Sequence, residues 1–510
     1  MSYTESESVL RGRGGVWAFW AGCAAVTLGV GLHVPMLLMA ADMGFRLTGM
    51  DMDQGMVLGM AVIVAGVGLA GFGLLPARAP ADLAAVAASP LGTAPLGAAH
   101  WRLMAVLAVA LVVDVMKPAS LGFVVPGMLD EYGLTRHIVA WVPFAALAGT
   151  VVGSLVWGAL ADVFGRRATI LLSSVMFVGT SICGAMPSFW WNAGMCFLMG
   201  AAAGGLLPVA YALLAEIMPT RHRGWSLVLV GGLGGVGGYL AASASSALLQ
   251  PLFGWRVMWL LNLPTGLLLV ALSGLIPESA KFLMATGRIA AAQQVMRRFG
   301  CVVVRPGDDA SPAAPPLPPR RLVGTTLALT MAGLAWGLIN FGLLLWLPAE
   351  LVARGASVAG SSALLAGSAL IALPTVFGAA ALYHWWSTKW ALAASMGVSA
   401  LGLAGTMLLP GGASPLLPVA LLIIGSNALL AMLLPYAAES YPLAVRGRAT
   451  GWVAGCTKAG GLIAQFLGIA AAVPPLGVAA LMALAPLLAG LALVARFGPE
   501  TSGRDLDAGH

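Results

Sequence analysis

Apolar residues along the chain gather into long runs that short polar segments separate. Crossing the hydrocarbon core of a bilayer takes about 20 apolar residues at a rise of about 1.5 Å each, and fourteen runs have that length. They are 15–40, 54–76, 102–127, 137–161, 168–187, 190–217, 224–249, 255–276, 322–347, 358–383, 389–410, 414–436, 449–471 and 473–496. The pattern predicts fourteen membrane-spanning helices, the first a signal anchor rather than a cleaved signal peptide.

Composition and charge support this membrane assignment. Hydrophobic residues make up 60% of the chain and charged residues 9%, which excludes a soluble protein with an ordinary surface. If the N-terminus lies inside, cytoplasmic segments hold 20 of the 26 Lys and Arg residues, as the positive-inside rule requires. We therefore expect both termini in the cytoplasm of a bacterial inner membrane. The net charge of +7 follows from basic side chains facing membrane lipid and needs no nucleic-acid partner.

An internal repeat relates the two halves of the chain. The pattern A-E-x-x-P-x-x-x-R-G occurs at 215–224 and again at 438–447, an offset of 223 residues. The helices that follow keep this register, since a Gly-Gly pair at 237–238 corresponds to one at 460–461. Repeats of about six helices are typical of transporters that bind their solute between the halves.

A further motif lies between the fourth and fifth runs. The segment GSLVWGALADVFGRR at 153–167 resembles the G-x-x-x-D-x-x-G-R-R loop of the major facilitator superfamily. Together with the repeat and with PESAKFL at 277–283, it resembles the sugar-porter and metabolite–proton symporter branches. The resemblance covers roughly 102–500 and implies two six-helix bundles that work by alternating access. The second copy of the loop is missing, because 378–389 reads GAAALYHWWSTK.

The predicted fold class is therefore an all-α integral membrane protein. It combines the major facilitator fold of twelve core helices with two N-terminal transmembrane helices, fourteen in total. The predicted parts are a two-helix extension at 1–100, a six-helix bundle at 101–276, a cytoplasmic linker at 277–321, a second bundle at 322–497 and a cytoplasmic tail at 498–510.

The charged loop at the end of the fourth run is a candidate gate. Carboxylate and guanidinium groups at facing helix ends can form ion pairs that break when the helices part. The alternative is a basic loop that only sets topology. The predicted gate residues are Asp162, Arg166, Arg167, Glu216, Arg223, Glu439 and Arg446.

Asp114 is the one carboxylate near the middle of a predicted span. An ionised Asp at that depth costs about 3 kcal/mol, so it is expected to face a cavity, to be protonated or to be paired. Lys117 lies three residues further on, on the same helical face. The pair is a candidate for proton coupling, with a static buried ion pair as the alternative. Sugar porters carry a coupling Asp in this first core helix. In sugar porters, an Arg of the fourth core helix usually partners that Asp. The corresponding helix of this chain, 190–217, has no Arg, so Lys117 would take its place.

Lys458 is a cation within an apolar span, which favours an anionic solute, with snorkelling to the interface as the alternative. Other polar or aromatic side chains at mid-span can bind a solute, although each alone can equally serve helix packing. These candidates are Asn262, Asn340, Asn427, Tyr239, Trp336 and Gln465.

The segment 33–60 holds seven of the 24 methionines. His33, Met36, Met39 and Met43 follow one helical stripe, and thioethers suit Cu(I). The alternative is adaptable packing, for which Met is well suited. The five cysteines form no CxxC pair, and neither an H-E-x-x-H motif, a nucleotide loop nor a catalytic triad occurs. The sequence predicts no enzyme and no cofactor.

The leading hypothesis is a proton-coupled secondary transporter for a small polar organic solute, such as an organic acid or a sugar-like metabolite. Its expected partners are the solute, the proton and membrane lipid, and it is expected to act as a monomer. The alternatives are a copper importer, a drug or metabolite efflux pump and a receptor without transport. The helix at 224–249 lacks the Gly-Pro usual in drug–proton antiporters, which weakens the efflux hypothesis.

Overall fold

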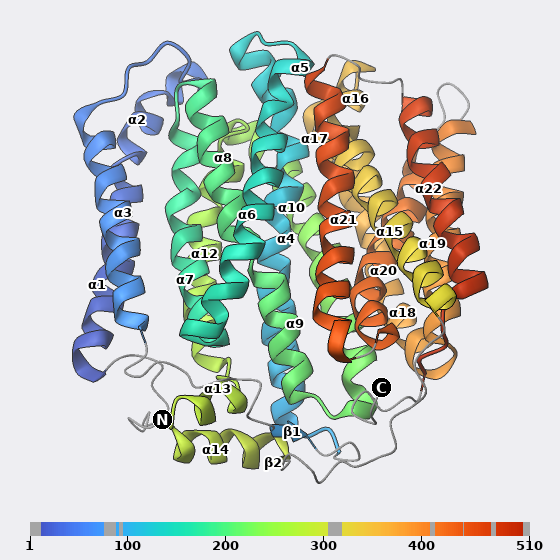
Figure 1. Cartoon of the computed structure of the whole chain (residues 1–510). Coiled ribbons are helices and arrows are strands. Elements are labelled where there is room, and N and C mark those ends of the chain that lie inside the picture. Colours follow the sequence, from blue (N-terminus) through green and yellow to red (C-terminus); the bar gives the residue numbers. More distant parts are fainter. Residues whose placement is uncertain are drawn as a thin grey trace. The chain divides into compact units, whose positions relative to one another are not determined.

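The structure is a computed structural model, and it describes residues 12–75, 88–90, 95–303, 319–408, 414–441, 443–470 and 476–502. Almost all of these residues are helical (Figure 1). Thirteen helical segments among them are long and apolar enough to cross a membrane, and they coincide with thirteen of the fourteen predicted runs. The remaining run, 449–471, lies in α21 (Leu443–Ile469), whose Lys458 and Gln465 lower its hydropathy.

The elements of the first half of the chain are α1 (Gly12–Gly31), α2 (Val34–Met39), η2 (Ala41–Met43), α3 (Gln54–Leu74), β1 (Ala88–Pro90), α4 (Ala98–Tyr132), α5 (Arg136–Val139), α6 (Trp141–Phe164), α7 (Arg166–Gly179), η4 (Thr180–Ala185), α8 (Phe189–Ala203), α9 (Leu206–Ile217), α10 (Thr220–Phe253), α11 (Val257–Leu260), α12 (Asn262–Leu272) and η5 (Ser273–Leu275). Those that follow are α13 (Ala280–Ala285), α14 (Ile289–Phe299), β2 (Cys301–Val303), α15 (Pro319–Gly337), η6 (Leu338–Leu344), α16 (Leu347–Ala353), α17 (Val358–Ala372), α18 (Thr375–Trp385), α19 (Thr388–Leu408), α20 (Leu416–Ser440), α21 and α22 (Leu476–Phe497).

Contacts divide the chain into two compact units. One comprises Met1–Lys117, Ala148–Pro219 and Leu249–Pro306, and the other comprises Pro118–Leu147, Thr220–Leu248 and Gly307–His510. These boundaries pass through α4, α6 and α10. The division into bundles at 101–276 and 322–497 stays a prediction.

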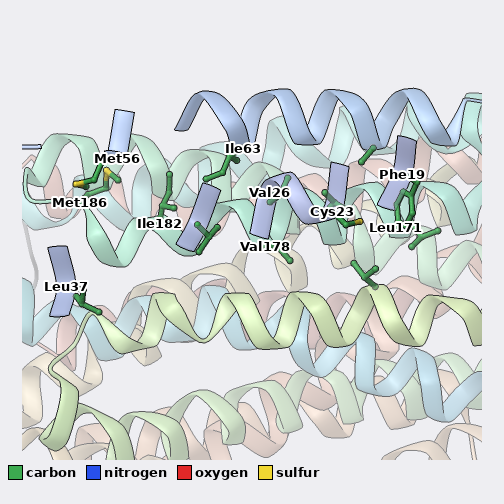
Figure 2. Packing of buried hydrophobic residues seen from close by; sticks show 14 of the residues in the cluster. Phe19, Cys23, Val26, Leu37, Met56, Ile63, Leu171, Val178, Ile182 and Met186 are labelled. Atoms are coloured by element: carbon green, nitrogen blue, oxygen red, sulfur yellow. The ribbon is translucent and has the colours of Figure 1, made fainter. Parts of the chain in front are cut away.

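In the first unit, α1 and α3 form an antiparallel hairpin (Figure 1). Glycines bring their backbones into contact, since a Cβ at Gly22 would lie 2.6 Å from the Gly66 carbonyl oxygen and one at Gly29 would lie 2.7 Å from that of Gly59. One side of the hairpin packs on α7 in a continuous apolar core (Figure 2). Small residues at helix crossings are the usual means of close packing in a membrane.

The predicted span 190–217 is broken between α8 and α9, at Gly204-Gly205. The Ser154 hydroxyl of α6 donates to the Gly204 carbonyl oxygen at 2.8 Å, and the Trp157 indole N–H donates to that of Ala201 at 2.6 Å. A break at membrane depth is stable only when such groups satisfy the freed backbone, so α6 supports this irregular turn.

Two short helices, α13 and α14, lie within the predicted linker 277–321, and β2 pairs antiparallel with β1, Ala88 opposite Val303. α14 is amphipathic, with Ala292, Val295 and Phe299 buried and Arg297 and Arg298 exposed. The proline-rich part of the linker, 312–318, lies outside the described residues.

In the second unit, α15 packs against α21 and α22, and α19 packs against α20 and α22. The span that begins with α15 changes to a π-helix at η6 before α16. π-Helical segments are frequent at functional sites. η6 contacts α21, the helix of Lys458.

Candidate functional site

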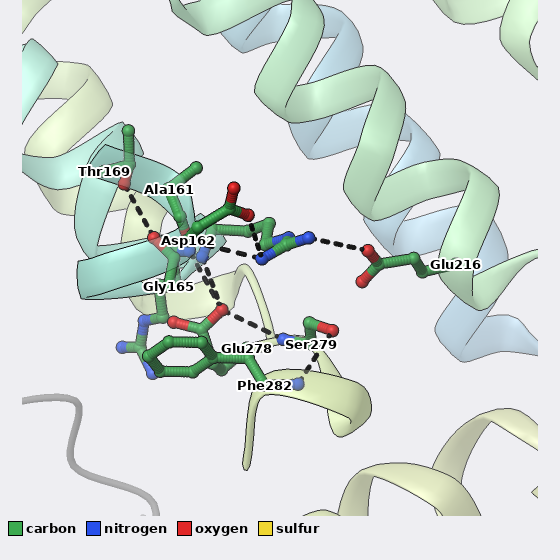
Figure 3. Close-up of polar contacts among 10 residues, drawn as sticks. Ala161, Asp162, Gly165, Thr169, Glu216, Glu278, Ser279 and Phe282 are labelled. Carbon is green, nitrogen blue, oxygen red and sulfur yellow. Dashed lines mark hydrogen bonds and ion pairs between the residues drawn. The ribbon is translucent and has the colours of Figure 1, made fainter. Parts of the chain in front are cut away.

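Ion pairs join the charged turn between α6 and α7 to α9 (Figure 3). The Arg166 guanidinium lies 3.1 Å from the Glu216 carboxylate of α9 and 3.5 Å from that of Asp162. The Asp162 side chain is 65% exposed, whereas that of Glu216 is 25% exposed. Because exposed pairs contribute little, Glu216 is the principal partner that ties α7 to α9.

Glu278 organises the same turn, a role that the sequence did not reveal. Its Oε1 accepts hydrogen bonds from the backbone N–H groups of Arg166 at 2.7 Å and Arg167 at 3.3 Å (Figure 3). The first N–H groups of a helix have no partner within the helix, and a carboxylate there is favoured by the helix dipole. Gly165 has a φ of 94°, and a Cβ on it would lie 2.5 Å from Glu278 Oε2, so glycine is required at the turn.

The charge state of Glu278 is set by two opposing effects. Its side chain is buried, and burial raises the pKa of the carboxyl group above its ordinary value. The backbone N–H groups of Ser279, Arg167 and Arg166 act in the opposite direction. Desolvation is the larger effect, so this carboxyl group binds its proton more tightly than an exposed Glu does.

The second unit uses a matching carboxylate where the charged loop is missing. Glu500 Oε1 accepts hydrogen bonds from Thr388 N–H at 3.0 Å and from the Thr388 hydroxyl at 2.8 Å, at the first residue of α19. The Ser387 hydroxyl donates to the other carboxylate oxygen. Pro277-Glu278 and Pro499-Glu500 are separated by 222 residues, close to the repeat offset, and this signal in the sequence was missed. In this unit, hydroxyl groups of Ser387 and Thr388 add to the backbone N–H donor at the helix start.

The hydrogen bonds described for Glu439, the repeat counterpart of Glu216, come from hydroxyl groups. Its Oε2 accepts from the Tyr383 hydroxyl at 2.8 Å and from the Thr501 hydroxyl at 2.6 Å. Arg223 acts on it through the charge of its guanidinium. The side chain of Arg446 lies outside the described residues. The charged contacts of the two repeats are therefore related in position but not identical in chemistry.

Asp114 and Lys117 are both buried within α4, at 7% and 2% exposure. The charge of Asp114 acts on Lys117, and the Lys117 ammonium lies over the ring of Phe177 in α7. Pro118 follows directly within the helix. A buried ammonium that interacts with both a carboxylate and an aromatic face is held in place by two separate attractions.

Lys458 of α21 lies beside the π-helical segment η6. Its ammonium is 6.0 Å from the centroid of the Phe341 ring, and Phe341 packs edge-on against Trp336 with ring centroids 5.6 Å apart. The Gln465 amide donates to the Phe341 carbonyl oxygen and accepts from the Trp346 indole at 3.2 Å. The structure thus places Lys458 and Trp336 beside the Phe341 ring, and Gln465 at the Phe341 backbone.

The other predicted solute residues are distributed more widely. Asn340 donates to the Trp336 carbonyl oxygen at 3.1 Å within the same segment. Asn427 of α20 faces Gly235 of α10, and Tyr239 lies one turn further along α10, 5.8 Å from the Phe123 ring. Asn262 is buried in α12 of the first unit. Lys458 and the other five candidates belong to the second unit.

An ion pair not predicted from the sequence links α5 to α16 within the second unit. The Arg136 guanidinium lies 3.1 Å from the Glu350 carboxylate, which also contacts Arg354 at 3.0 Å. Both Arg136 and Glu350 line a cavity of about 80 Å³ together with Trp346 and Gly468. The pair joins residues that are 214 positions apart in the sequence.

The residues of the copper hypothesis lie in different surroundings. His33 and Met36 are buried, at 1% and 4% exposure, while Met39 and Met43 are 71% and 52% exposed. His33 lies between α1 and α2, and its Nδ1 is 2.9 Å from the Gly29 carbonyl oxygen of α1. Met56 and Met186 pack together in the apolar core (Figure 2). Four of the cysteines are buried and free. Among the described residues, no group of three His, Cys, Asp or Glu side chains could hold a metal.

Comparison with known proteins agrees with the motifs. The family model of the Major Facilitator Superfamily matches residues 107–465. The chain belongs to the Major Facilitator Superfamily. It is 27% identical to the niacin transporter NiaP of Acinetobacter baylyi over 432 residues, which cover 81% of this chain and 97% of that one. It is 33% identical to the gallate transporter of Pseudomonas putida over 208 residues, covering 39% and 44% of the two chains.

The solved structures agree on the fold. The proton:xylose symporter XylE covers 80% of this chain and 98% of its own, with a TM-score of 0.63 at 16% identity. The resemblance predicted from the motifs is therefore confirmed, and the fold is that of the superfamily. The chain is a multi-pass membrane transporter and not an enzyme.

Proposed function

We propose that this protein is a proton-coupled secondary transporter that moves an aromatic carboxylate by alternating access. The observation that carries the proposal is the position of Lys458 beside the Phe341 ring, with Trp336 against that ring. A cation next to aromatic faces suits a solute that has both a carboxylate and a flat ring. The relatives include transporters named for niacin, 4-hydroxybenzoate, gallate and benzoate, all of which are aromatic acids.

The arrangement in the membrane forms part of the proposal. The chain crosses the membrane fourteen times, α21 included, with both termini in the cytoplasm of a bacterial inner membrane. Bundles at 101–276 and 322–497 alternate around the solute, and the protein acts as a monomer. The bias of basic residues and the repeat at an offset of 223 support this arrangement.

Proton coupling is assigned to Asp114 with Lys117. A carboxylate and an ammonium buried on the same face compete for one proton when their surroundings change. The Phe177 face holds Lys117 from the α7 side. A shift of α7 relative to α4 would weaken that contact and alter the affinity of Asp114 for its proton.

Gating is assigned to the ion pairs at opposite ends of the helices. On the proposed cytoplasmic side, Arg166 joins Glu216 while Asp162 contributes a weaker, exposed contact. On the proposed outer side, Arg136 joins Glu350 between the two halves of the sequence. Charge-assisted pairs of this kind can break and re-form as the helices part.

The solute assignment is tested by binding of nicotinate and 4-hydroxybenzoate to the purified protein. Lys458→Met is expected to weaken binding about tenfold or more, the loss of one charge-assisted hydrogen bond. Arg448→Gln removes an exposed cation from the same helix and should leave binding unchanged. Equal affinity of the wild type and Lys458→Met, or a preference for a neutral sugar over both acids, would contradict the assignment.

A further inference from the structure

A second cavity lies in the first unit, beside α14 and at the ends of α4 and α7. Its volume is about 270 Å³, far more than the roughly 30 Å³ that a water molecule occupies. It is lined by residues of α4, α7, α14 and the segment before α13. Its polar lining residues are Arg102, Arg167, Arg288, Arg298, Glu278 and Gln294.

The lining carries more positive than negative charge. Four of the polar residues are arginines and one is a carboxylate. The single negative charge of Glu278 can balance at most one of these four positive charges. Among the described residues, no hydrogen-bond partner faces the buried Nε of Arg167. Guanidinium donors in excess at a concave surface favour a bound anion.

The pKa of Arg288 reflects its burial among these charged side chains. Burial lowers the pKa of its guanidinium from the ordinary value, and the neighbouring charge of Arg167 acts in the same direction, against the attraction of Glu278. An anion in the cavity would offset both the cost of burying the Arg288 guanidinium and its repulsion by Arg167. Planar guanidinium groups bind phosphate oxygens in a bidentate manner, which makes phosphate the best match for several arginines.

Apolar side chains lie beside this basic cluster. Leu275, which lines the cavity, is 47% exposed, and Ile289 at the start of α14 is 51% exposed. α14 has a buried apolar face, and Arg297 and Arg298 lie in its last turn. A basic amphipathic helix of this kind suits the boundary between lipid headgroups and acyl chains. Basic pockets near helix ends on the cytoplasmic side can bind phospholipid headgroups.

We propose that the cavity lined by Arg102, Arg167, Arg288 and Arg298 binds a phosphate-centred anion, carried by an anionic phospholipid or by a soluble phosphate ester. The site is separate from the proposed solute site at Lys458, which belongs to the other compact unit. Its test therefore requires no transport measurement and does not depend on the identity of the solute.

The test uses the full-length protein in detergent. One arm measures retention of phosphatidylglycerol against phosphatidylcholine from mixed micelles by native mass spectrometry. The other arm measures binding of glycerol phosphate by calorimetry. Arg298→Gln and Arg288→Gln are each expected to weaken the favoured probe about tenfold. Arg297→Gln is the matched control, because it removes the same charge from an exposed position of α14 that does not line the cavity.

Selective retention of phosphatidylglycerol that is lost in Arg298→Gln but kept in Arg297→Gln supports a lipid as the source of the phosphate. Binding of glycerol phosphate with the same dependence on the variants supports a soluble ester. The proposal is overturned if neither probe binds, or if Arg297→Gln weakens binding as much as Arg298→Gln and Arg288→Gln. Arg298 is exposed, so its variant remains informative if Arg288→Gln does not fold.

Discussion

At the scale of single residues, Glu278 holds the charged turn together from outside it. Its carboxylate caps the start of α7, although Glu278 follows Arg167 by 111 residues in the sequence. Removing that acceptor leaves buried N–H groups without a partner, and hydrogen bonds to a charged group contribute about 1.5–3 kcal/mol each. The turn that carries the proposed gate residues depends on this contact.

The pH dependence of stability tests the buried state of Glu278. Its pKa in the folded protein is raised above the unfolded value of about 4.3. Its contribution to the free energy of unfolding is therefore fully present below that value and is lost as the pH rises through the raised pKa. As the pH rises from the unfolded value of about 4.3 through the raised pKa, the melting temperature of Glu278→Gln should fall less than that of the wild type.

Asp42→Asn, at an exposed carboxylate, serves as the control and should follow the wild type. A Glu278→Gln variant whose melting temperature changes with pH as the wild type does would mean that this carboxyl group is not desolvated. Glu278→Ala, which removes the acceptor as well, should be less stable than Glu278→Gln by about 1–3 kcal/mol at every pH.

Sequence reasoning found part of this site and missed the rest for a physical reason. Asp162 and Arg166 stand four residues apart in the sequence, at the end of α6 and the start of α7, so their spacing alone predicts proximity. Glu278 binds the start of α7 and Glu500 binds the start of α19. Each lies more than a hundred residues from that helix start in the sequence, so only the tertiary fold brings them together. The repeated Pro-Glu at an offset of 222 was the available signal.

At the scale of helices, hydropathy predicted the spans well because the bilayer imposes one length on all of them. It did not predict the break at Gly204-Gly205 or the π-helical segment η6, because both depend on side chains of neighbouring helices or on local hydrogen bonds. It also missed α13 and α14. Those two helices are amphipathic or short, and their polar content resembles that of a linker.

The packing of the N-terminal hairpin gives a prediction with an internal control. A Cβ on Gly66 of α3 would lie 2.8 Å from Val26 Cγ2 and 2.9 Å from the Gly22 carbonyl oxygen. Gly66→Ala should therefore force α1 and α3 apart and destabilise the protein by about 1–3 kcal/mol, measured by thermal unfolding in detergent.

Gly68 lies two residues further along α3 and is exposed, with nothing within 4 Å of a Cβ placed there. Gly68→Ala should leave the melting temperature unchanged or raise it slightly, since alanine favours the helix. Equal effects of the two substitutions would show that the two helices do not pack through Gly66.

At the scale of the whole molecule, the Arg136–Glu350 pair predicts how the proposed outer gate responds to mutation. Arg136→Gln removes the contact between α5 and α16, so the cavity that both residues line should open more often. The measurement is the labelling rate of a single cysteine at Gly468, in a variant without the native cysteines, by an impermeant thiol reagent added outside.

Arg354→Gln is the matched control, because Arg354 contacts Glu350 only within one helix at four residues' spacing and is 60% exposed. It should change the labelling rate little. If both arginine variants label at the wild-type rate, Arg136 and Glu350 do not form a gate.

The most direct test of the central claim is uptake of labelled nicotinate into proteoliposomes with an imposed proton gradient. The account predicts accumulation that requires the gradient, disappears with a protonophore and loses its pH dependence in Asp114→Asn. Accumulation that is the same with and without the gradient, or an Asp114→Asn variant that matches the wild type at every pH, would contradict proton-coupled transport through this site.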